Sequence, residues 1–492
     1  MDGKKLGARI KKLFYKYWFI LVILITLFLR LPSLFEPFTY GDEGIYLTLG
    51  QALRKGLILY RDIHDNKPPL LYLLAAVAGE FSRFRLILFV WSFATIFMFY
   101  KLSFVLFPKN KLSPIISTAL FSFLSSIHSF EGNVANAENF MLLPTILGFW
   151  LILKKSGQKK YWLLAGALFS LATLFKFPAA FDFTAALAFV FLTTKIKKFL
   201  FQASNLVIGF ILPVLATILY FASQNALNQY LKAAFFQNLP YLSSWTQDKI
   251  QAGGLPLALL SRGLLVFLLF LFIFIFRKKF SPQVKLILTW FSFSLFAALL
   301  SARPYPHYLL QILPPLSLSV GMFYCHREKL IPGVLIMVLV ATFIIFKFWY
   351  YPNLPYLFNY YAYLVKFKNQ DQYFKFFDPQ TEAIYQAAVY IKTHTSPSEK
   401  IFVWGNQPAI YALSGRLPVG RYTVAYHIKD YHGYQETIKA LLNNPPRYLV
   451  ILDEYRQSFP DLAIFIERNY LPQIQFNQIQ IFHKIYGKIR NQ

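Results

Sequence analysis

Apolar runs of about 20 residues, separated by short polar segments, recur from the N-terminus to about residue 350. Such a run matches the thickness of a bilayer. Its backbone groups must bond within the segment, so each run is predicted to be a transmembrane helix. We expect eleven of them, at about residues 17–35, 84–107, 113–127, 138–153, 161–175, 178–194, 199–221, 255–276, 284–300, 306–324 and 330–350.

Short basic clusters orient these helices, because cytoplasmic loops carry an excess of Lys and Arg. Placing every cluster inside puts the N-terminus in the cytoplasm and the end of the eleventh helix outside. No small-residue cleavage site follows the first run, so we expect a retained span and not a signal peptide. The clusters are Lys4, Lys5, Arg9, Lys11, Lys12 and Lys16, then Lys109 with Lys111, and the segments 154–160, 195–198, 277–279 and 326–329.

One apolar stretch, "PPLLYLLAAVAGEF" at 68–81, does not fit this series. Its length of about 14 residues is too short to span comfortably. Counting it as a crossing would also put the N-terminal cluster and Lys109 on opposite sides. We therefore predict a helix that lies in, or dips into, the outer face of the membrane.

The chain changes character after the last span. Residues 349–364 are dense in Tyr, which is typical of a membrane interface, so 351–378 is expected to be an interfacial linker. From 379 to 492 helix and strand patterns mix, which predicts a small extracytoplasmic α/β domain after a transmembrane domain at 1–350. Helices are expected in "TEAIYQAAVYIKTH" and "GYQETIKALLNN", and strands in "KIFVWG", "RYLVILD" and "IQFNQIQIFHK".

The composition agrees with a polytopic α-helical membrane protein. Hydrophobic residues make up 56% of the 492 positions, charged residues only 15%, and the mean hydropathy is +0.43. In a soluble chain the formal charge of +28 would suggest nucleic acid. Here much of it sits in loop clusters, so no nucleic-acid partner is expected. The single cysteine, Cys325, excludes an intrachain disulfide.

With this topology most of the unusual polar residues fall on the outer face, in the external loops 36–67, 126–140 and 222–254 and beside short turns. Ionisable groups close to a span are costly and usually functional. Each also has a structural interpretation: loop acids are commonly solvated, and Lys or Arg near a span can reach lipid phosphates. Arg30 and Asp182 we interpret as structural ion-pair partners. The residues that converge outside are Asp42, Glu43, Lys67, Arg85, His128, Glu131, Asn136, Glu138, Lys176, Arg303 and His307.

The stretch "YGDEGIYLTLGQAL…DNKPPLLYLL" resembles the first external loop of the protein O-mannosyltransferase and aminoarabinose-transferase superfamily. These are type C glycosyltransferases that use a polyprenyl-phosphate sugar. The matching positions are Asp42-Glu43, Tyr46 and Lys67-Pro68-Pro69. Further on, "FRLILFVWS" with Arg85, "TLFKFPAA" with Lys176, "RPYPHYLLQILPPLSL" with His307 and Tyr308, and "VWGNQPAIYALSGRLP" in the tail resemble later segments of the family, in order.

Two positions depart from the family pattern. Phe177 stands where Gly is commoner, and the loop 126–140 has Asn136 or Glu138 where relatives often carry Asp. The identity of the second acid is therefore open.

The resemblance implies inverting transfer of a monosaccharide from a polyprenyl-phosphate donor to a hydroxyl of an extracytoplasmic lipid, glycan or protein. Such a hydroxyl needs a base, and the leaving phosphate needs cations. Asp42 is the expected base, and Glu43 would orient it or the acceptor. Donor-phosphate ligands would be Lys67, Arg85, Lys176, Arg303 and His307, and acceptor or sugar ligands would be Tyr46, Asn136, Glu138, Tyr305 and Tyr308.

No cofactor is expected, and although a divalent metal between Asp42, Glu43 and Glu138 is conceivable, the family is not generally thought to need one. The expected location is the cell membrane. We also predict that the Lys67 ammonium reaches Asp42 or Glu43, because both must border one sugar-phosphate. Two alternatives remain: a transporter or flippase for lipid-linked sugars, although no matched halves are visible, and an enzyme that transfers a whole oligosaccharide.

Overall fold

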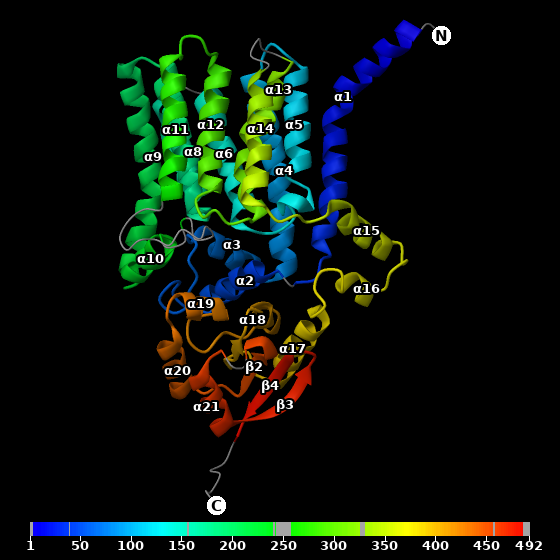
Figure 1. Ribbon diagram of the computed structural model, residues 1–492, viewed down its shortest axis with the longest axis vertical. Helices are drawn as coiled ribbons and strands as arrows, with labels where there is room; N and C mark the ends of the chain where they lie inside the picture. The colour runs from blue at the N-terminus through cyan, green and yellow to red at the C-terminus, as the bar shows by residue number, and fades with distance from the viewer. Residues whose placement is uncertain are drawn as a thin grey trace, which may run out of the picture. The chain divides into compact units, whose positions relative to one another are not determined.

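A helix lies in each of the eleven ranges that the sequence predicts as spans, as the computed structural model of the protein shows. The structure describes residues 3–38, 40–154, 157–239, 242, 257–324, 330–455 and 458–485. Parts of the clusters at 154–160 and 326–329 and of the loop 222–254 lie outside the described residues. The eleven helices are α1 (Gly3–Arg30), α4 (Phe81–Leu106), α5 (Leu112–Leu124), α6 (Ala137–Lys154), α7 (Lys159–Phe175), α8 (Ala180–Thr193), α9 (Ile196–Ser223), α11 (Leu257–Ile275), α12 (Pro282–Ala298), α13 (Leu313–Met322) and α14 (Leu330–Phe346) (Figure 1).

The described chain divides into two units that are discontinuous in sequence. Unit 1 comprises Met1–Leu34, Leu88–Leu219 and Asn238–Leu357, and unit 2 comprises Phe35–Ile87, Tyr220–Gln237 and Phe358–Gln492. The segment 35–87 therefore belongs to the same unit as most of the C-terminal tail, from residue 358 onwards. The predicted domain boundaries at 350 and 378 stay a prediction.

Several apolar helices identify an integral membrane protein. By length and composition, five described segments can cross a bilayer: Tyr15–Leu34, Phe81–Leu106, Ala137–Lys154, Ile196–Ser223 and Ala258–Ile275. In the segments from α9 and α11 only 17% and 11% of the residues are buried, although both are strongly apolar. Apolar faces of this kind are expected against lipid. The full count of eleven crossings and their orientation stay predictions.

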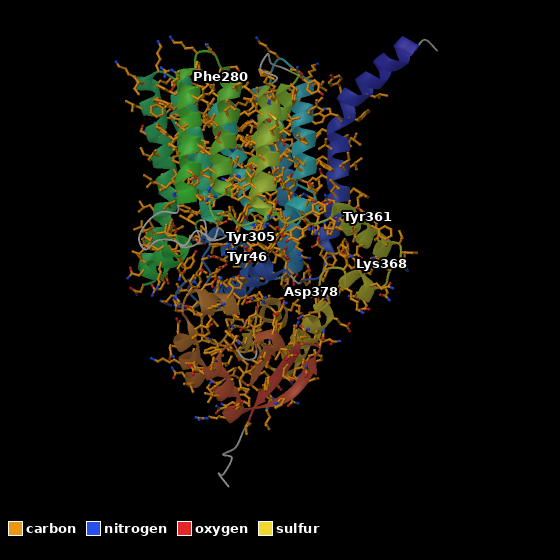
Figure 2. The ribbon with its side chains drawn as sticks, in the orientation of Figure 1. Tyr46, Phe280, Tyr305, Tyr361, Lys368 and Asp378 are labelled. Carbon is orange, nitrogen blue, oxygen red and sulfur yellow. The ribbon has the colours of Figure 1, made fainter. Side chains whose placement is uncertain are left out.

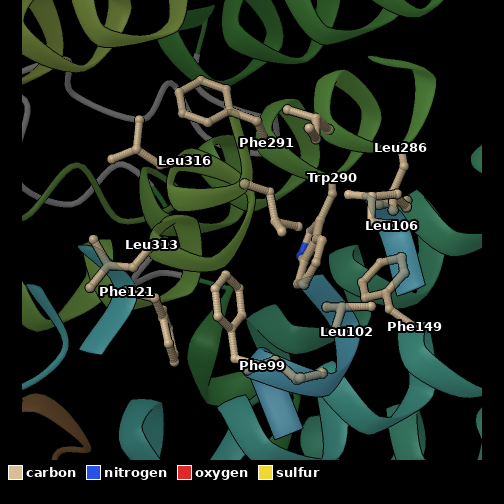
Figure 3. Packing of buried hydrophobic residues seen from close by; sticks show 14 of the residues in the cluster. Phe99, Leu102, Leu106, Phe121, Phe149, Leu286, Trp290, Phe291, Leu313 and Leu316 are labelled. Atoms are coloured by element: carbon tan, nitrogen blue, oxygen red, sulfur yellow. The ribbon is translucent and has the colours of Figure 1, made fainter. Parts of the chain in front are cut away.

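The core of unit 1 is a continuous cluster of aliphatic and aromatic side chains between these helices (Figure 3). The indole of Trp290 in α12 stacks on Phe149 of α6 with ring centres 4.0 Å apart, and Phe99 of α4 stacks on Phe121 of α5 at 4.2 Å. Offset stacking of this kind adds to the gain from burial. The short 3₁₀ helices η1 (Leu31–Leu34), η2 (His128–Phe130), η3 (Phe177–Ala179) and η5 (Pro306–Ile312) connect the long helices.

Unit 2 contains a four-stranded sheet with helices around it. The strand order is β1-β2-β4-β3, with β1 parallel to β2 and the other pairs antiparallel. The strands are β1 (Phe402–Trp404), β2 (Tyr448–Leu452), β3 (Tyr470–Phe476) and β4 (Ile479–Lys484). The helices are α2 (Gly41–Arg54), α3 (Leu70–Ala78), α10 (Leu227–Ala234), α16 (Gln370–Phe374), α17 (Thr381–His394), α18 (Ala409–Ser414), α19 (Ala425–Asp430), α20 (Tyr434–Asn443) and α21 (Pro460–Asn469), with α15 (Asn353–Leu364) at the boundary.

The sequence prediction of a single last strand in "IQFNQIQIFHK" is wrong. This segment contributes the end of β3 and the whole of β4, which pair as a hairpin. Asn477 lies between them with φ of 49°, a left-handed conformation that Asn tolerates and that tight hairpin turns require. Only two adjacent polar residues, Asn477 and Gln478, interrupt the alternating apolar pattern at the turn, and the sequence interpretation read through them.

The predicted loop 36–67 contains a helix, α2, which packs against helices of both neighbouring and distant segments. Thr48 Oγ1 lies 3.4 Å from the Pro408 carbonyl, and Gln51 donates to the Ala412 carbonyl at 2.9 Å. Two glycines permit this close approach: a methyl group added at Gly44 would lie 2.8 Å from the Ala409 nitrogen, and one at Gly50 would lie 2.6 Å from the Ala75 backbone. Helix α2 is thus held between α3 and α18.

The helix predicted in 68–81 is α3, with nine residues. At 1.5 Å per residue it is about 14 Å long, which is half the hydrocarbon thickness. It does not span a membrane by itself, and its position at the outer face stays a prediction.

Candidate active site

Helix α2 carries the adjacent acids Asp42 and Glu43 in its first turn. Successive helical residues point about 100° apart, so the two carboxylates leave the helix in different directions. The Glu43 side chain is 1% exposed, whereas that of Asp42 is 32% exposed. The positive end of the helix dipole favours both negative charges. Asp42 is therefore the accessible acid of the pair.

Asp42 lies beside a phenol and an ammonium group. Tyr46, one turn further along α2 and labelled in Figure 2, donates its hydroxyl hydrogen to Asp42 Oδ2 at 2.7 Å. Burial raises the pKa of Tyr46 well above its usual value, and the charges of Asp42 and Asp65 raise it further, so Tyr46 remains a donor. Lys67 Nζ lies 3.4 Å from the same oxygen and 5.0 Å from the centre of the Tyr46 ring. The predicted proximity of Lys67 and Asp42 is confirmed.

Asp65 completes this arrangement, and sequence reasoning did not select it. Its fully buried carboxylate accepts hydrogen bonds from the Tyr72 hydroxyl at 2.8 Å and from the Asn66 backbone N–H at 2.7 Å. It also lies 3.8 Å from Lys67 Nζ and 3.5 Å from His427 Nε2. We refer to Asp42, Tyr46, Asp65 and Lys67 as the Asp42 site.

The backbone carbonyl and N–H of Lys67 both form hydrogen bonds to tyrosine hydroxyl groups. The Tyr60 hydroxyl donates to the Lys67 carbonyl at 2.7 Å, and the Lys67 N–H donates to the Tyr72 hydroxyl at 3.1 Å. Tyr60 is fully buried with φ of 68°, a conformation that is rare for a bulky residue. Backbone strain of this kind persists only where the surrounding contacts hold the residue in place, and it is concentrated at functional sites.

Arg85, predicted as a phosphate ligand, forms a buried ion pair with Glu43. Arg85 Nε and Nη2 lie 3.0 Å and 2.7 Å from Glu43 Oε2, and the side chains are 3% and 1% exposed. The guanidinium also donates to the carbonyls of Glu36 and Pro37. These contacts give Arg85 and Glu43 a structural role, and the roles predicted for them in donor binding and orientation stay untested.

Unit 1 brings four further residues together, which we call the Glu138 cluster: Glu131, Glu138, Lys176 and His307. Lys176 Nζ pairs with Glu138 and lies 4.1 Å from the centre of the Tyr308 ring. His307 Nδ1 contacts Glu131, and its Nε2 lies 3.6 Å from Glu138. Glu138 and Glu131 thus already contact Lys176 and His307.

The remaining predicted ligands lie around this cluster or serve the backbone. The Tyr305 ring stacks on the His307 ring at 5.6 Å. Asn136 precedes α6, and its Oδ1 accepts from the Asn139 backbone N–H at 3.2 Å, which is an N-cap interaction. For Arg303 the structure gives a backbone bond to Ser301. Ligand roles for these residues stay predictions.

Arg30 and Asp182 have structural roles as expected, but their partners are neutral groups and not ions. Arg30 donates to Ser126 and to the carbonyls of Gly132 and Ser125. Asp182 accepts from Trp290 at 2.9 Å, Ser294 at 2.7 Å and Gln311 at 2.9 Å. Buried charges need such hydrogen bonds when no counter-ion is present.

Within the described residues, no group of three or more His, Cys, Asp or Glu side chains is arranged to hold a metal ion. The expectation that the protein needs no metal remains untested.

A buried histidine beside the Asp42 site makes a pH-dependent stability testable. His64 is 2% exposed, and within the described chain neither of its ring nitrogens has a hydrogen-bond partner. Burial lowers the pKa of His64 well below its usual value, and His427, Arg421 and Lys232 lower it further. In the unfolded chain His64 takes up its proton near pH 6.5. Because the folded protein resists that proton, stability falls as the pH drops below this value.

We therefore expect the melting temperature of the purified protein to decrease between pH 7.5 and pH 5. The variant His64→Phe should show a smaller decrease, because it removes this titration and leaves an aromatic ring against Tyr422 and Tyr431. The exposed histidine His394 provides the control, and His394→Phe should behave like the parent. An identical slope in His64→Phe and parent protein would contradict the prediction.

Comparison with known proteins finds similarity among solved structures. No family model and no curated protein matches the chain. Among solved structures, ArnT from Cupriavidus metallidurans bound to undecaprenyl phosphate aligns with 95% of this chain and 98% of its own, with a TM-score of 0.57 at 11% identity. The apo state of ArnT aligns over 96% and 98%, with a TM-score of 0.56 at 13% identity. AglB from Archaeoglobus fulgidus aligns over 98% and 75%, with a TM-score of 0.49 at 13% identity.

These structural neighbours are type C glycosyltransferases that depend on a polyprenyl phosphate. The protein has the fold of ArnT, from end to end. The resemblance inferred from the sequence motifs is thereby confirmed at the level of the fold.

Proposed function

We propose that the protein is a membrane glycosyltransferase that moves a monosaccharide from a polyprenyl-phosphate donor to a hydroxyl group of an acceptor outside the cytoplasm. The observation that carries the proposal is the pairing of an accessible carboxylate, Asp42, with the Lys67 ammonium at 3.4 Å. A hydroxyl acceptor needs a proton acceptor of this kind, and a phosphate leaving group needs a cation.

In the proposed reaction Asp42 takes the proton of the acceptor hydroxyl as its oxygen forms a bond to the anomeric carbon. The bond from that carbon to the phosphate oxygen breaks, and the polyprenyl phosphate leaves with its electron pair. Attack opposite the leaving group inverts the anomeric centre. Tyr46 holds the Asp42 carboxylate through its 2.7 Å hydrogen bond to Oδ2, which fixes the orientation of the carboxylate.

Lys67 would stabilise the negative charge that develops on the leaving phosphate. Its side chain is 20% exposed, so it is accessible to a ligand. Lys176 and His307 are the proposed cations from unit 1. Since Glu138 and Glu131 already contact them, a phosphate would have to exchange places with a carboxylate there. The proposed donor ligands Arg303 and Arg85 and the acceptor ligands Tyr305, Tyr308 and Asn136 remain to be tested by substitution.

The polyprenyl donor explains why such a site would be carried on apolar helices. A polyprenyl tail partitions into the bilayer. The exposed apolar faces of α9 and α11 would lie against lipid there. ArnT, which has the same fold, is seen with undecaprenyl phosphate bound. We propose that the N-terminus is cytoplasmic and that the tail is outside, which places the Asp42 site on the outer side.

The test is a transfer assay with the purified full-length protein, a panel of polyprenyl-phosphate sugars and a panel of lipid, glycan and peptide acceptors. Release of free polyprenyl phosphate is measured together with glycosylated acceptor, because the first product is independent of which acceptor is used. A donor that is consumed with equal formation of both products supports the proposal. Transport of donors across vesicles with no release of polyprenyl phosphate would support the alternative of a flippase and contradict the proposal.

A further inference from the structure

Three charges meet in the Asp42 site, and only one of them is positive. Lys67 Nζ lies 3.4 Å from Asp42 and 3.8 Å from Asp65, so one ammonium is shared by two carboxylates. The carboxylates differ in surroundings: Asp42 is partly exposed, whereas Asp65 is 1% exposed at its side chain. A buried charge is retained only when it is paired and hydrogen-bonded. Asp65 is thus the fixed partner of Lys67, and Asp42 is the partner that a substrate can reach.

Asp65 is held from two directions. The Tyr72 hydroxyl of α3 and the Asn66 N–H donate to it, while the Tyr72 oxygen accepts from Lys67 N–H at 3.1 Å. On its other side, His427 of α19 brings Nε2 to 3.5 Å from Asp65 Oδ1. His427 is 3% exposed, and burial lowers its pKa below the usual value. Its lowered pKa favours the neutral form of His427, which competes with Lys67 for the Asp65 carboxylate less than a charged imidazole would.

We infer that Asp65, supported by Tyr72 and by His427 from the C-terminal segment, is a positioning residue that shares the Lys67 ammonium with Asp42. The inference rests on the proposed function. Because Lys67 is shared between two carboxylates, its ammonium is held in position to meet the leaving phosphate. Asp42 keeps the proton affinity that a base needs. Without Asp65 a larger share of the attraction of Lys67 would act on Asp42, and Asp42 would be a weaker base.

This inference predicts a specific change in the pH dependence of transfer. The titratable groups around Asp42 and Lys67 come from α2, from the segment that precedes α3, from α3 itself and from α19. They are Tyr46, Asp65, Lys67, Tyr72, His427 and Tyr431. In the variant Asp65→Asn, which keeps size and an acceptor for Tyr72, we expect kcat to fall about 10- to 100-fold with the donor KM within about 2-fold. The acid limb of the pH–rate profile should move to lower pH.

Two further variants separate positioning from folding. Tyr72→Phe removes the hydroxyl that bonds both Asp65 and Lys67 but keeps every charge, so kcat should fall while the acid limb stays in place. His427→Ala should lower kcat about 10-fold, and His427→Gln should restore most of it, because its amide can donate near the position of Nε2. The matched controls are Asp62→Asn, an acid of the same segment that pairs with Arg61, and His394→Ala, an exposed histidine. Both controls should keep parental kinetics.

A readout that does not depend on activity distinguishes this inference from the proposed function. The rate at which an amine-specific reagent modifies Lys67 is measured by mass spectrometry, relative to the exposed Lys375. Removing one carboxylate disfavours the charged form of Lys67 and increases the fraction of neutral amine, which is the form that reacts. Lys67 in Asp65→Asn should therefore react several-fold faster than in the parent protein at the same pH.

The outcomes are distinguishable. Faster Lys67 modification together with a shifted acid limb supports both proposals. Faster modification in a protein that shows no transfer with any donor supports the arrangement of Asp65 and Lys67 and contradicts the proposed function. A correctly folded Asp65→Asn protein with parental Lys67 reactivity and an unmoved acid limb would overturn the inference, whatever its residual rate.

Discussion

Replacing Asp42 by Asn is expected to lower the rate of sugar transfer by roughly 10²–10⁴-fold, the usual contribution of a positioned general base. The substitution preserves size and leaves an oxygen that can accept from Tyr46, whose hydroxyl lies 2.7 Å from Asp42 in the parent. It removes the group that would take the acceptor proton in the proposed reaction. Donor binding should change little, because Lys67 keeps its second carboxylate, Asp65, at 3.8 Å. Initial rates at saturating donor, together with a donor-binding measurement, test this expectation.

The control for Asp42→Asn is Asp62→Asn, which changes the charge of another partly exposed acid, one that lies between α2 and α3. Asp62 is bonded to Arg61 and has no contact with Lys67 among the interactions found, so transfer should stay within about twofold. Full activity of Asp42→Asn would remove this residue from the mechanism. Glu43 would then be the next candidate, although its buried pairing with Arg85 leaves it little freedom to accept a proton.

The second large effect concerns stability. Replacing Arg85 by Ala should destabilise the protein by about 3–5 kcal/mol, the range found when one partner of a buried ion pair is removed. Glu43 would keep its charge at 1% exposure without its guanidinium, and the carbonyls of Glu36 and Pro37 would lose their donor. Thermal or denaturant unfolding in a fixed detergent measures the change.

A matched control lies two residues away. Arg83 pairs with Glu80 at 3.0 Å, but both side chains are more than half exposed, so Arg83→Ala should shift stability by no more than about 0.5 kcal/mol. In the double variant Glu43→Gln with Arg85→Met, which removes both charges, most of the loss should be recovered. If Arg85→Ala were as stable as parent protein and lost only donor affinity, the phosphate-binding role predicted from the sequence would be the correct one.

The Asp42 site could be predicted in part because its residues are close in sequence. Asp42 and Tyr46 are one helical turn apart, and Lys67 follows in the same segment, so a motif could identify all three. Asp65 could not be recognised, because in "DIHDNKPP" it looks like an ordinary solvated turn acid. Its burial depends on Tyr72 and on His427, which is contributed by a helix near the other end of the chain.

Arg85 shows a different limit of prediction from the sequence. A basic residue at the start of a span is typical of a phosphate contact at the membrane surface. Whether its charge is free depends on where Glu43 points, and this follows from the orientation of α2 against its neighbours. The apolar runs, in contrast, correspond well to helices, since a bilayer imposes a length that can be counted along the chain.

The bond between Thr48 and Pro408 joins residues that are 360 positions apart. During synthesis at about 5–20 residues per second, α2 therefore emerges roughly 20–70 s before the helix on which it packs. Throughout that interval the buried face of α2, with Gly44, Thr48 and Gln51, has no partner from the tail. The nascent chain is then expected to be a better substrate for chaperones and proteases than the finished protein, and ribosome stalling before residue 409 should leave helix α2 open to cleavage.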